Sequence, residues 1–361
     1  DTNKGMAEVL SGKQGNSDSS NPNEQAGIQA GTQLQAAYLA AAKDFAAGIT
    51  DPNNATQTFS NPDQVQAYKD ALAGMKDGSQ TPASDQNDPK SDSPIYAIAK
   101  QQAQNVQNAV AAAQGSQNVA NGQPNKDADL ANANGYNNPD NKSDMNDAYT
   151  AAANAYSDAI NHTNGDNPTD QSKYSPADQM AYAQAYKAAK DAAAKGLTDF
   201  GNGNKNQQPT NPADKAAYDK AQNDALAGLN DGLANHADAT KQANNPAYKQ
   251  GVDDAAAIQK AAEDAVNGTS TGKANLTPNQ QAAYDNIKDA ADAGQTEYTD
   301  HPDLYAGKTG DDLKNAANQA AQAKYPNDPL KQAAFAQAIE AAGDAFGKGA
   351  EAFGNNEQQP T

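Results

Sequence analysis

The sequence contains no cysteine, no tryptophan and no arginine. Without cysteine the chain can form no disulfide, no thiolate zinc site and no thiol nucleophile. Its 26 lysines are outnumbered by 45 acidic residues, and the net charge is −19. Because nucleic acids are bound by basic surfaces that usually carry arginine, this charge balance argues against a nucleic-acid partner.

Long apolar runs are also missing. No stretch approaches the roughly 20 residues that a membrane-spanning helix needs. The first 20 residues have neither the charged nor the apolar segment of a signal peptide. We therefore expect no membrane span and, if the protein is exported, a mature chain.

Bulky apolar side chains are scarce, since Ile, Leu, Val and Phe supply only about a tenth of the chain. Low apolar content with a large net charge is typical of disordered proteins. The spacing of these residues favours helices instead, because they recur every three or four positions, with Ala filling most places between them. Six such stripes are Leu34, Tyr38, Ala41, Phe45; Val65, Tyr68, Leu72, Met75; Met145, Tyr149, Ala152, Tyr156, Ile160; Tyr182, Tyr186, Ala189, Ala193, Leu197; Tyr218, Ala221, Ala225, Leu229; and Phe335, Ile339, Ala342, Phe346.

Helix starts are marked by a small polar residue followed by proline. The polar side chain can accept free amide hydrogens of the first turn, and proline is well tolerated at the first helical position. In five cases an aromatic residue follows six positions after the proline. The seven predicted starts are Asn61-Pro62, Ser93-Pro94, Ser175-Pro176, Asn211-Pro212, Asn245-Pro246, Thr277-Pro278 and Asp328-Pro329.

Glycine followed by an apolar residue predicts helix ends, through a left-handed residue and a hydrophobic contact with the last turn. Candidate ends are Gly48 and Gly196, and Gly74 and Gly228 within two nearly duplicate segments. From Pro176 to Pro278 the starts recur every 32 to 36 residues. Each repeat is therefore one long helix and one polar connector, unlike the helix pairs of tetratricopeptide repeats.

These patterns predict an all-α fold of tandem long Ala- and Tyr-rich helices with long polar connectors. We expect successive helices to form an antiparallel bundle, and a helical-repeat rod is the alternative. The chain divides into a polar N-terminal arm (1–21), a helical region with irregular repeats (22–140), regular helical repeats of about 34 residues (141–300), and a C-terminal helical segment with a short polar tail (301–361).

Candidate catalytic groups are few. The sequence has no HExxH helix, phosphate-binding loop, dinucleotide fingerprint or nucleophile elbow. With so few bulky residues, a water-excluding active site would be hard to build. We expect no enzymatic activity, no cofactor and no metal site, and interpret the three histidines as caps or surface residues: His162, His236 and His301.

Tyrosine rings can stack on the apolar face of a sugar while Asn, Gln and Asp bind its hydroxyls. Tyrosines at helical spacing are needed for the core, so those outside the stripes are the better candidates for ligand or subunit contacts: Tyr136, Tyr174, Tyr298, Tyr305 and Tyr325. The N-terminal arm has a short apolar patch that could dock on a neighbouring molecule, with Met6, Val9 and Leu10 as its contacts.

The helical segments are rich in Ala, Asn, Gln and Asp and carry Tyr in repeats such as Ser175-Pro176-Ala177-Asp178-Gln179-Met180-Ala181-Tyr182. Together with the acidic balance, this composition resembles secreted or surface-attached proteins of Gram-positive bacteria, especially lactobacilli. The resemblance implies an adhesin, aggregation factor or matrix component without catalytic residues. The last seven residues contain no complete sortase signal, so we expect release, noncovalent attachment, or a processed or truncated end.

Sequence alone thus favours a non-enzymatic extracellular structural or adhesive protein that self-associates into a fibre, matrix or surface layer. The alternative is a module that binds cell-wall or host glycans on the bacterial surface. An enzyme ranks third.

Overall fold

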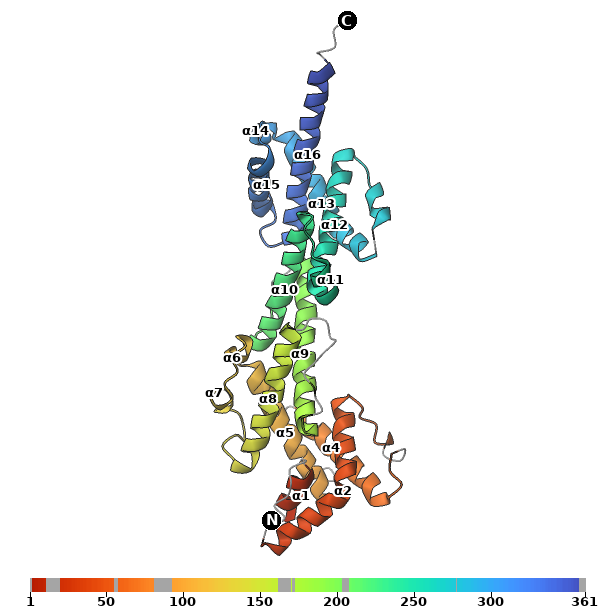
Figure 1. The fold of residues 1–361 in the computed structure, drawn as a ribbon, viewed down its shortest axis with the longest axis vertical. Helices are drawn as coiled ribbons and strands as arrows, with labels where there is room; N and C mark the ends of the chain where they lie inside the picture. Colours follow the sequence, from red (N-terminus) through yellow and green to blue (C-terminus); the bar gives the residue numbers. More distant parts are fainter. Residues whose placement is uncertain are drawn as a thin grey trace. The chain divides into compact units, whose positions relative to one another are not determined.

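The fold is given by a computed structural model that describes residues 2–10, 20–54, 58–80, 93–161, 170, 173–202, 208–276 and 278–356. Within these residues the chain is all-helical and contains no strand, which confirms the predicted fold class (Figure 1). Contacts between residues group the chain into two compact units. The first unit comprises 1–191 and 210–217, and the second comprises 192–209 and 218–361. The predicted four-part division differs from this grouping and stays a prediction.

In the first unit each long helix packs against the next along the chain, from α1 to α2, α4, α5 and α8. Its helices are α1 (Thr2–Leu10), α2 (Pro22–Ala46), α4 (Pro62–Gly78), α5 (Pro94–Gln114), α6 (Gln117–Ala120), α7 (Lys126–Leu130) and α8 (Pro139–Asn161). Two further long helices, α9 (Pro176–Gly201) and α10 (Pro212–Leu233), contribute residues to both units.

In the second unit α12, α13 and α16 pack on one another, and α15 packs on α16. The elements after α10 are α11 (Ala239–Asn244), α12 (Pro246–Asn267), the 3-10 helix η2 (Thr271–Asn275), α13 (Pro278–Asp300), α14 (Pro302–Tyr305), α15 (Gly310–Lys324) and α16 (Pro329–Asn356). The short helices α14 and α15 lie in the sequence between α13 and α16, which are nonetheless direct neighbours.

All seven predicted helix starts are confirmed, because a helix begins at each of the seven prolines. The caps work as expected: the Asn61 side chain accepts a hydrogen bond from the Asp63 amide at 2.9 Å, and Asn245 accepts one from Tyr248 at 3.0 Å. These bonds satisfy amide hydrogens that have no partner inside the helix. The same signal also begins helices at Pro22 and Pro139, two starts beyond the seven predicted.

The direction of packing differs from the expected antiparallel arrangement. At the junction of α4 and α5, Gly74 lies against Tyr96 and Gly78 against Lys100, so both positions advance by four residues in the same direction. At the junction of α10 and α12, Gly228 lies against Tyr248 and Gly232 against Val252. These helices run parallel and staggered, with the start of one against the end of the previous one. A parallel neighbour requires a connector that runs back along the overlap, whereas antiparallel neighbours need only short turns.

The predicted helix ends are only partly right. Gly48 follows α2 with a φ of 79°, as a helix-ending glycine should. Gly74, Gly196 and Gly228 instead lie inside helices, at points where two helices touch. A Cβ at Gly228 would be 2.0 Å from the carbonyl oxygen of Tyr248. Glycine is required there by close helix contact rather than by a turn.

The predicted apolar stripes form the core. The largest fully buried side chains are mainly stripe residues, including Tyr38, Tyr68, Tyr149, Tyr182 and Phe335. Alanines fill the remaining helix contacts, which lets the helices approach closely despite the low content of bulky residues. Some stripe residues, such as Leu34 and Leu197, are half-buried, and Phe346 is 71% exposed. No described helix is both long and apolar enough to cross a membrane.

Candidate functional site

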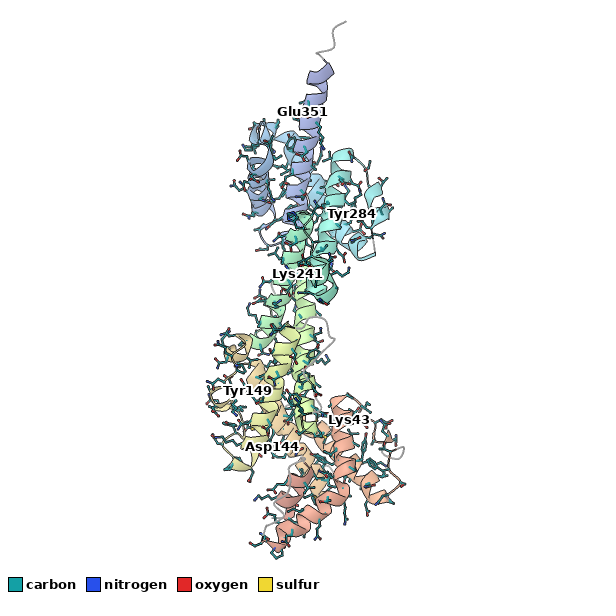
Figure 2. All side chains as sticks on the ribbon, in the orientation of Figure 1. Lys43, Asp144, Tyr149, Lys241, Tyr284 and Glu351 are labelled. Carbon is teal, nitrogen blue, oxygen red and sulfur yellow. The ribbon has the colours of Figure 1, made fainter. Side chains whose placement is uncertain are left out.

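Tyrosine hydroxyls and acidic side chains form a recurrent pair at the helix junctions. A tyrosine near the start of one helix donates a hydrogen bond to an aspartate near the end of the preceding long helix. Six such pairs span 2.6 to 2.9 Å: Tyr68–Asp44, Tyr96–Asp77, Tyr182–Asp158, Tyr218–Asp199, Tyr248–Asp231 and Tyr284–Asp264. Tyr149 pairs with Asp129 of α7, and Tyr156 with Asp214 at 2.7 Å. Figure 2 labels Tyr149 and Tyr284.

The acidic partners were not predicted from the sequence. A signal for them exists, because each of the six aspartates follows a small residue by three positions, as in Gly74 and Asp77 or Ala261 and Asp264. The small residue lets the next helix approach, and the carboxylate one turn later meets the tyrosine hydroxyl. The spacing is shared by the six junctions but is not specific to them, because Gly48 and Asp51 have it after the end of α2.

These pairs alter the titration of the tyrosines. Burial, together with the bond to Asp199, raises the pKa of Tyr218 to about 12. The pKa values of Tyr68 and Tyr182 are raised by the same two causes. The hydroxyls therefore stay neutral donors at physiological pH and are occupied in packing, not available for proton transfer.

Two of the five candidate tyrosines are buried. The Tyr136 hydroxyl lies 3.2 Å from Asn146 Oδ1, and Lys142 Nζ lies 5.1 Å from the centre of the Tyr136 ring. Tyr305 is buried in a small cluster with Leu313. The structure places both rings in packing, because α7 and α8 cover one and α14 to α16 cover the other. A ligand or subunit contact at either tyrosine stays a prediction.

The other three candidates are half-buried and pack on aromatic neighbours. Tyr174 lies against Tyr182, with ring centres 5.9 Å apart. Tyr298 stacks on Tyr305 at 5.6 Å, and Tyr325 meets Phe335 edge-on at 5.8 Å. Tyr136 and Tyr174 belong to the first unit, and the other three belong to the second. Each closes the edge of a local core.

The apolar patch of the N-terminal arm lies within α1. Leu10 is fully buried, and Met6 and Val9 are nearly so, because α1 packs against α2 of the same chain. In this conformation the patch is occupied by an intramolecular contact, and its docking on a neighbouring molecule stays a prediction.

The last turns of α16 carry Phe346, the most exposed large apolar side chain among the described residues. Every residue from 344 to 351 is exposed, and no described atom lies within 4 Å of a Cβ built on Gly347 or Gly349. In Figure 1 this part of α16 extends past α13 and α15, and Figure 2 labels Glu351 on it. Phe346 continues the core-facing stripe of Phe335, Ile339 and Ala342 beyond the last helix that covers it.

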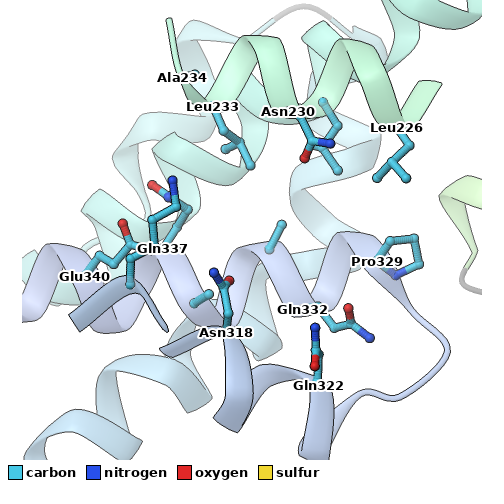
Figure 3. Close-up of a pocket in the computed structure, with 14 residues that line it drawn as sticks. Leu226, Asn230, Leu233, Ala234, Asn318, Gln322, Pro329, Gln332, Gln337 and Glu340 are labelled. Carbon is cyan, nitrogen blue, oxygen red and sulfur yellow. The ribbon is translucent and has the colours of Figure 1, made fainter. Parts of the chain in front are cut away.

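A groove of about 400 Å³ lies between α10, α15 and α16 of the second unit (Figure 3). Its floor is aliphatic, and side-chain amides from all three helices point into it: Asn230, Asn318, Gln322, Gln332 and Gln337. Glu340 supplies its one carboxylate, and burial raises the pKa of that group although Lys314 opposes the shift. The lining contains no histidine, hydroxyl nucleophile or second acid, so it suits polar binding rather than acid–base chemistry.

Metal-ligating side chains do not cluster within the described residues, where no group of three or more His, Asp or Glu could hold an ion. Of the three histidines, His301 is exposed with Nδ1 3.3 Å from Glu297, and His236 follows the end of α10. His162 lies outside the described residues. Comparison of the chain with known protein families, with curated proteins and with solved structures finds no match.

Proposed function

We propose that this chain is a non-enzymatic structural or adhesive protein that self-associates through its helical surfaces. The observation that carries the proposal is the uncovered apolar end of α16, where Phe346 is 71% exposed on a stripe that elsewhere forms the core. A large aromatic side chain held in water on a rigid helix is a typical protein contact.

The use of the reactive side chains supports the same proposal. Tyrosine hydroxyls and buried aspartates, which could otherwise serve in binding or catalysis, join consecutive helices. A scaffold whose polar groups hold helices together is suited to mechanical or adhesive work. Its action outside the cell, in a fibre, matrix or surface layer, rests on the compositional resemblance to secreted Gram-positive proteins.

Analytical ultracentrifugation across a wide concentration range tests the proposal. We expect the average mass to rise with concentration and Phe346→Asp to weaken this association at least fivefold. Leu304→Asp is the matched control, since Leu304 is also an exposed large apolar residue but lies on the short helix α14. A strictly monomeric protein at high concentration would overturn the proposal.

The second candidate function is glycan binding, and the amide-lined groove is the observation that favours it. Asn and Gln side chains both donate and accept hydrogen bonds, as sugar hydroxyls require. The test is a glycan array followed by the double variant Asn318→Ala with Gln337→Ala. Loss of binding in that variant, but not in Asn315→Ala on the exposed side of α15, would support it. An array without hits would reject it.

A further inference from the structure

The short helix α1 occupies a glycine-lined groove on α2. A Cβ on Gly27 would lie 2.0 Å from the Thr2 carbonyl oxygen, and one on Gly5 would lie 2.3 Å from that of Glu24. Lys4 Nζ is 3.5 Å from Glu24 Oε1, and Gln35 Nε2 donates to the Val9 carbonyl at 2.8 Å. A helix that binds this groove is therefore held by close backbone contact, by an ion pair with Glu24 and by a hydrogen bond from Gln35.

This contact repeats the helix junctions found elsewhere. Gly5 meets the residue two positions after the first proline of α2, as Gly74 does in α5 and Gly228 does in α12. The helices α1 and α2 also run in the same direction, since Gly5 lies against Glu24 and Gly31 against Val9. The helix α1 therefore fills, with nine residues, the place that the end of a long helix takes at other junctions.

The uncovered end of α16 has the features that α1 presents to this groove. Lys348-Gly349 matches Lys4-Gly5, and an apolar residue follows each glycine: Met6 in α1 and Ala350 in α16. Phe346 stands three positions before Gly349, where α1 has Thr2. On a helix these positions share one face. Of the two helix segments, α1 is covered and the α16 end is open.

We propose that the exposed end of α16, residues 344–351, of one copy binds the α2 groove of a second copy in the place of α1. This inference rests on the self-association proposed above and specifies its contact. Because the two surfaces differ and lie on different parts of the chain, the contact is head-to-tail and leaves a free end on each copy for another molecule. The chain then extends by the same parallel helix junction that it uses internally.

The tethered α1 competes with the second copy. A segment joined to its site by a short linker has an effective concentration in the millimolar range. Intact protein should therefore associate weakly, and a variant whose α1 is displaced should associate far more strongly. Leu10→Asp places a charge at a fully buried position of α1, and Gly5→Leu clashes with the Glu24 backbone. Either variant should release α1, so the test does not depend on one substitution.

Chemical cross-linking between two distinguishable copies tests the contact. The first copy carries Leu10→Asp and Glu24→Cys, and the second carries Lys348→Cys, so each has a single thiol in a cysteine-free chain. A short bismaleimide should join first to second copies at least fivefold more than it joins like copies. Lys308→Cys, an exposed position outside α16, replaces Lys348→Cys as the control and should give only background.

Substitutions at two glycines of α16, Gly349 and Gly347, distinguish this docking from nonspecific hydrophobic association. Gly349→Leu, added to the second copy, should reduce the mixed product to background, because the equivalent Gly5 touches backbone. Gly347→Leu adds the same apolar surface on another face of α16 and should leave the product unchanged. Circular dichroism confirms that each variant remains helical.

Two outcomes would overturn the inference while leaving self-association intact. Dominant cross-linking between two Lys348→Cys copies would show that α16 ends pair with each other. A mixed product no greater than the Lys308→Cys control, in protein that still associates by ultracentrifugation, would place the contact elsewhere. Absence of all association would reject both the inference and the proposed function.

Discussion

The two buried aspartates of α12 differ in how their carboxylates are satisfied. Asp254 is 2% exposed and Asp264 is 5% exposed. Asp264 accepts hydrogen bonds from the Tyr284 hydroxyl at 2.8 Å, the Thr269 hydroxyl at 2.9 Å and the Gly272 amide at 2.9 Å. Asp254 accepts one from Gln250 at 2.9 Å, and its Oδ2 atom has no partner among the described residues.

The pKa values of the two carboxyl groups move in opposite directions. Burial raises the pKa of Asp254 to about 7, and the neighbouring Asp253 adds to the rise. Burial acts on Asp264 as well, but the bonds from Tyr284, Thr269 and Gly272 outweigh it and hold its pKa below the usual value. A buried carboxylate in this fold is therefore favourable where it receives the tyrosine hydroxyl and other donors of a helix junction, as Asp264 does.

The sign of each effect on stability follows from linkage. Asp264 has a lowered pKa, so its stabilisation is present above the unfolded pKa of about 4 and is lost as the pH falls. Asp254 has a raised pKa, so its contribution is complete below about pH 4 and is lost as the pH rises through about 7.

Asp264→Ala should have the largest effect. It removes the acceptor of three hydrogen bonds and leaves buried donors without partners. We expect a loss of about 4 kcal/mol in the free energy of unfolding of the second unit, measured by urea denaturation at pH 7. Asp285→Ala, which removes an exposed partner of Lys273, is the control and should cost less than about 1 kcal/mol. Equal losses would contradict the special role of the junction.

Tyr284→Phe should cost about 2 kcal/mol, because a hydrogen bond to a charged group is lost while the ring still packs. The pKa of Asp264 should rise, which moves the acid-induced loss of stability to higher pH. Tyr325→Phe is the control, since the Tyr325 hydroxyl has no hydrogen bond recorded within the described part of the chain. If the two variants unfold alike, the hydroxyl does not stabilise the junction.

Unlike the two preceding substitutions, Asp254→Asn should raise the free energy of unfolding of the second unit, by about 1.5 kcal/mol at pH 8. The reason is that an ionised carboxylate is no longer buried with an unpartnered oxygen. At pH 4 the substitution should be neutral, since Asp254 is then protonated in the folded protein. Urea denaturation of both proteins from pH 4 to pH 8 measures the free energy of unfolding. The fall in this free energy with rising pH that Asp254 causes in the wild-type protein should be absent in the variant. A gain that is the same at every pH would point to packing instead.

The sequence predicted what is local and periodic. Proline after a small polar residue located the helix starts, and the stripe containing Tyr68 identified a buried face without reference to any other helix. The partner of Tyr68 was not predictable in this way, because Asp44 lies on another helix and the junction must be known before the two can be paired. The same limit explains why α13 and α16 were not expected as neighbours across α14 and α15.

Three of the four predicted helix-ending glycines were wrong for a different reason. A glycine before an apolar residue fits both a helix end and a close helix contact, and only Gly48 among the four candidates has a positive φ. The candidate tyrosines were chosen because they lie outside the stripes. A core with few bulky residues also needs aromatic side chains at its edges, and Tyr305 is buried in this way. The acid three residues after the glycine does not separate helix contacts from helix ends either, because Asp51 follows Gly48 at the same spacing.

Thr269→Val should have the smallest effect, a loss of under about 1 kcal/mol, and it tests how Asp264 is held. The Thr269 hydroxyl reaches Oδ1, whereas Tyr284 and Gly272 both donate most closely to Oδ2. Valine keeps the shape and removes one neutral donor in a partly exposed position, where water can replace it. Carbon NMR titration of Asp264 should show a smaller rise in pKa than in Tyr284→Phe. If Thr269→Val destabilises as much as Tyr284→Phe, the loop after α12 rather than the helix junction secures this carboxylate, and the six tyrosine pairs would then stabilise the fold less than their geometry indicates.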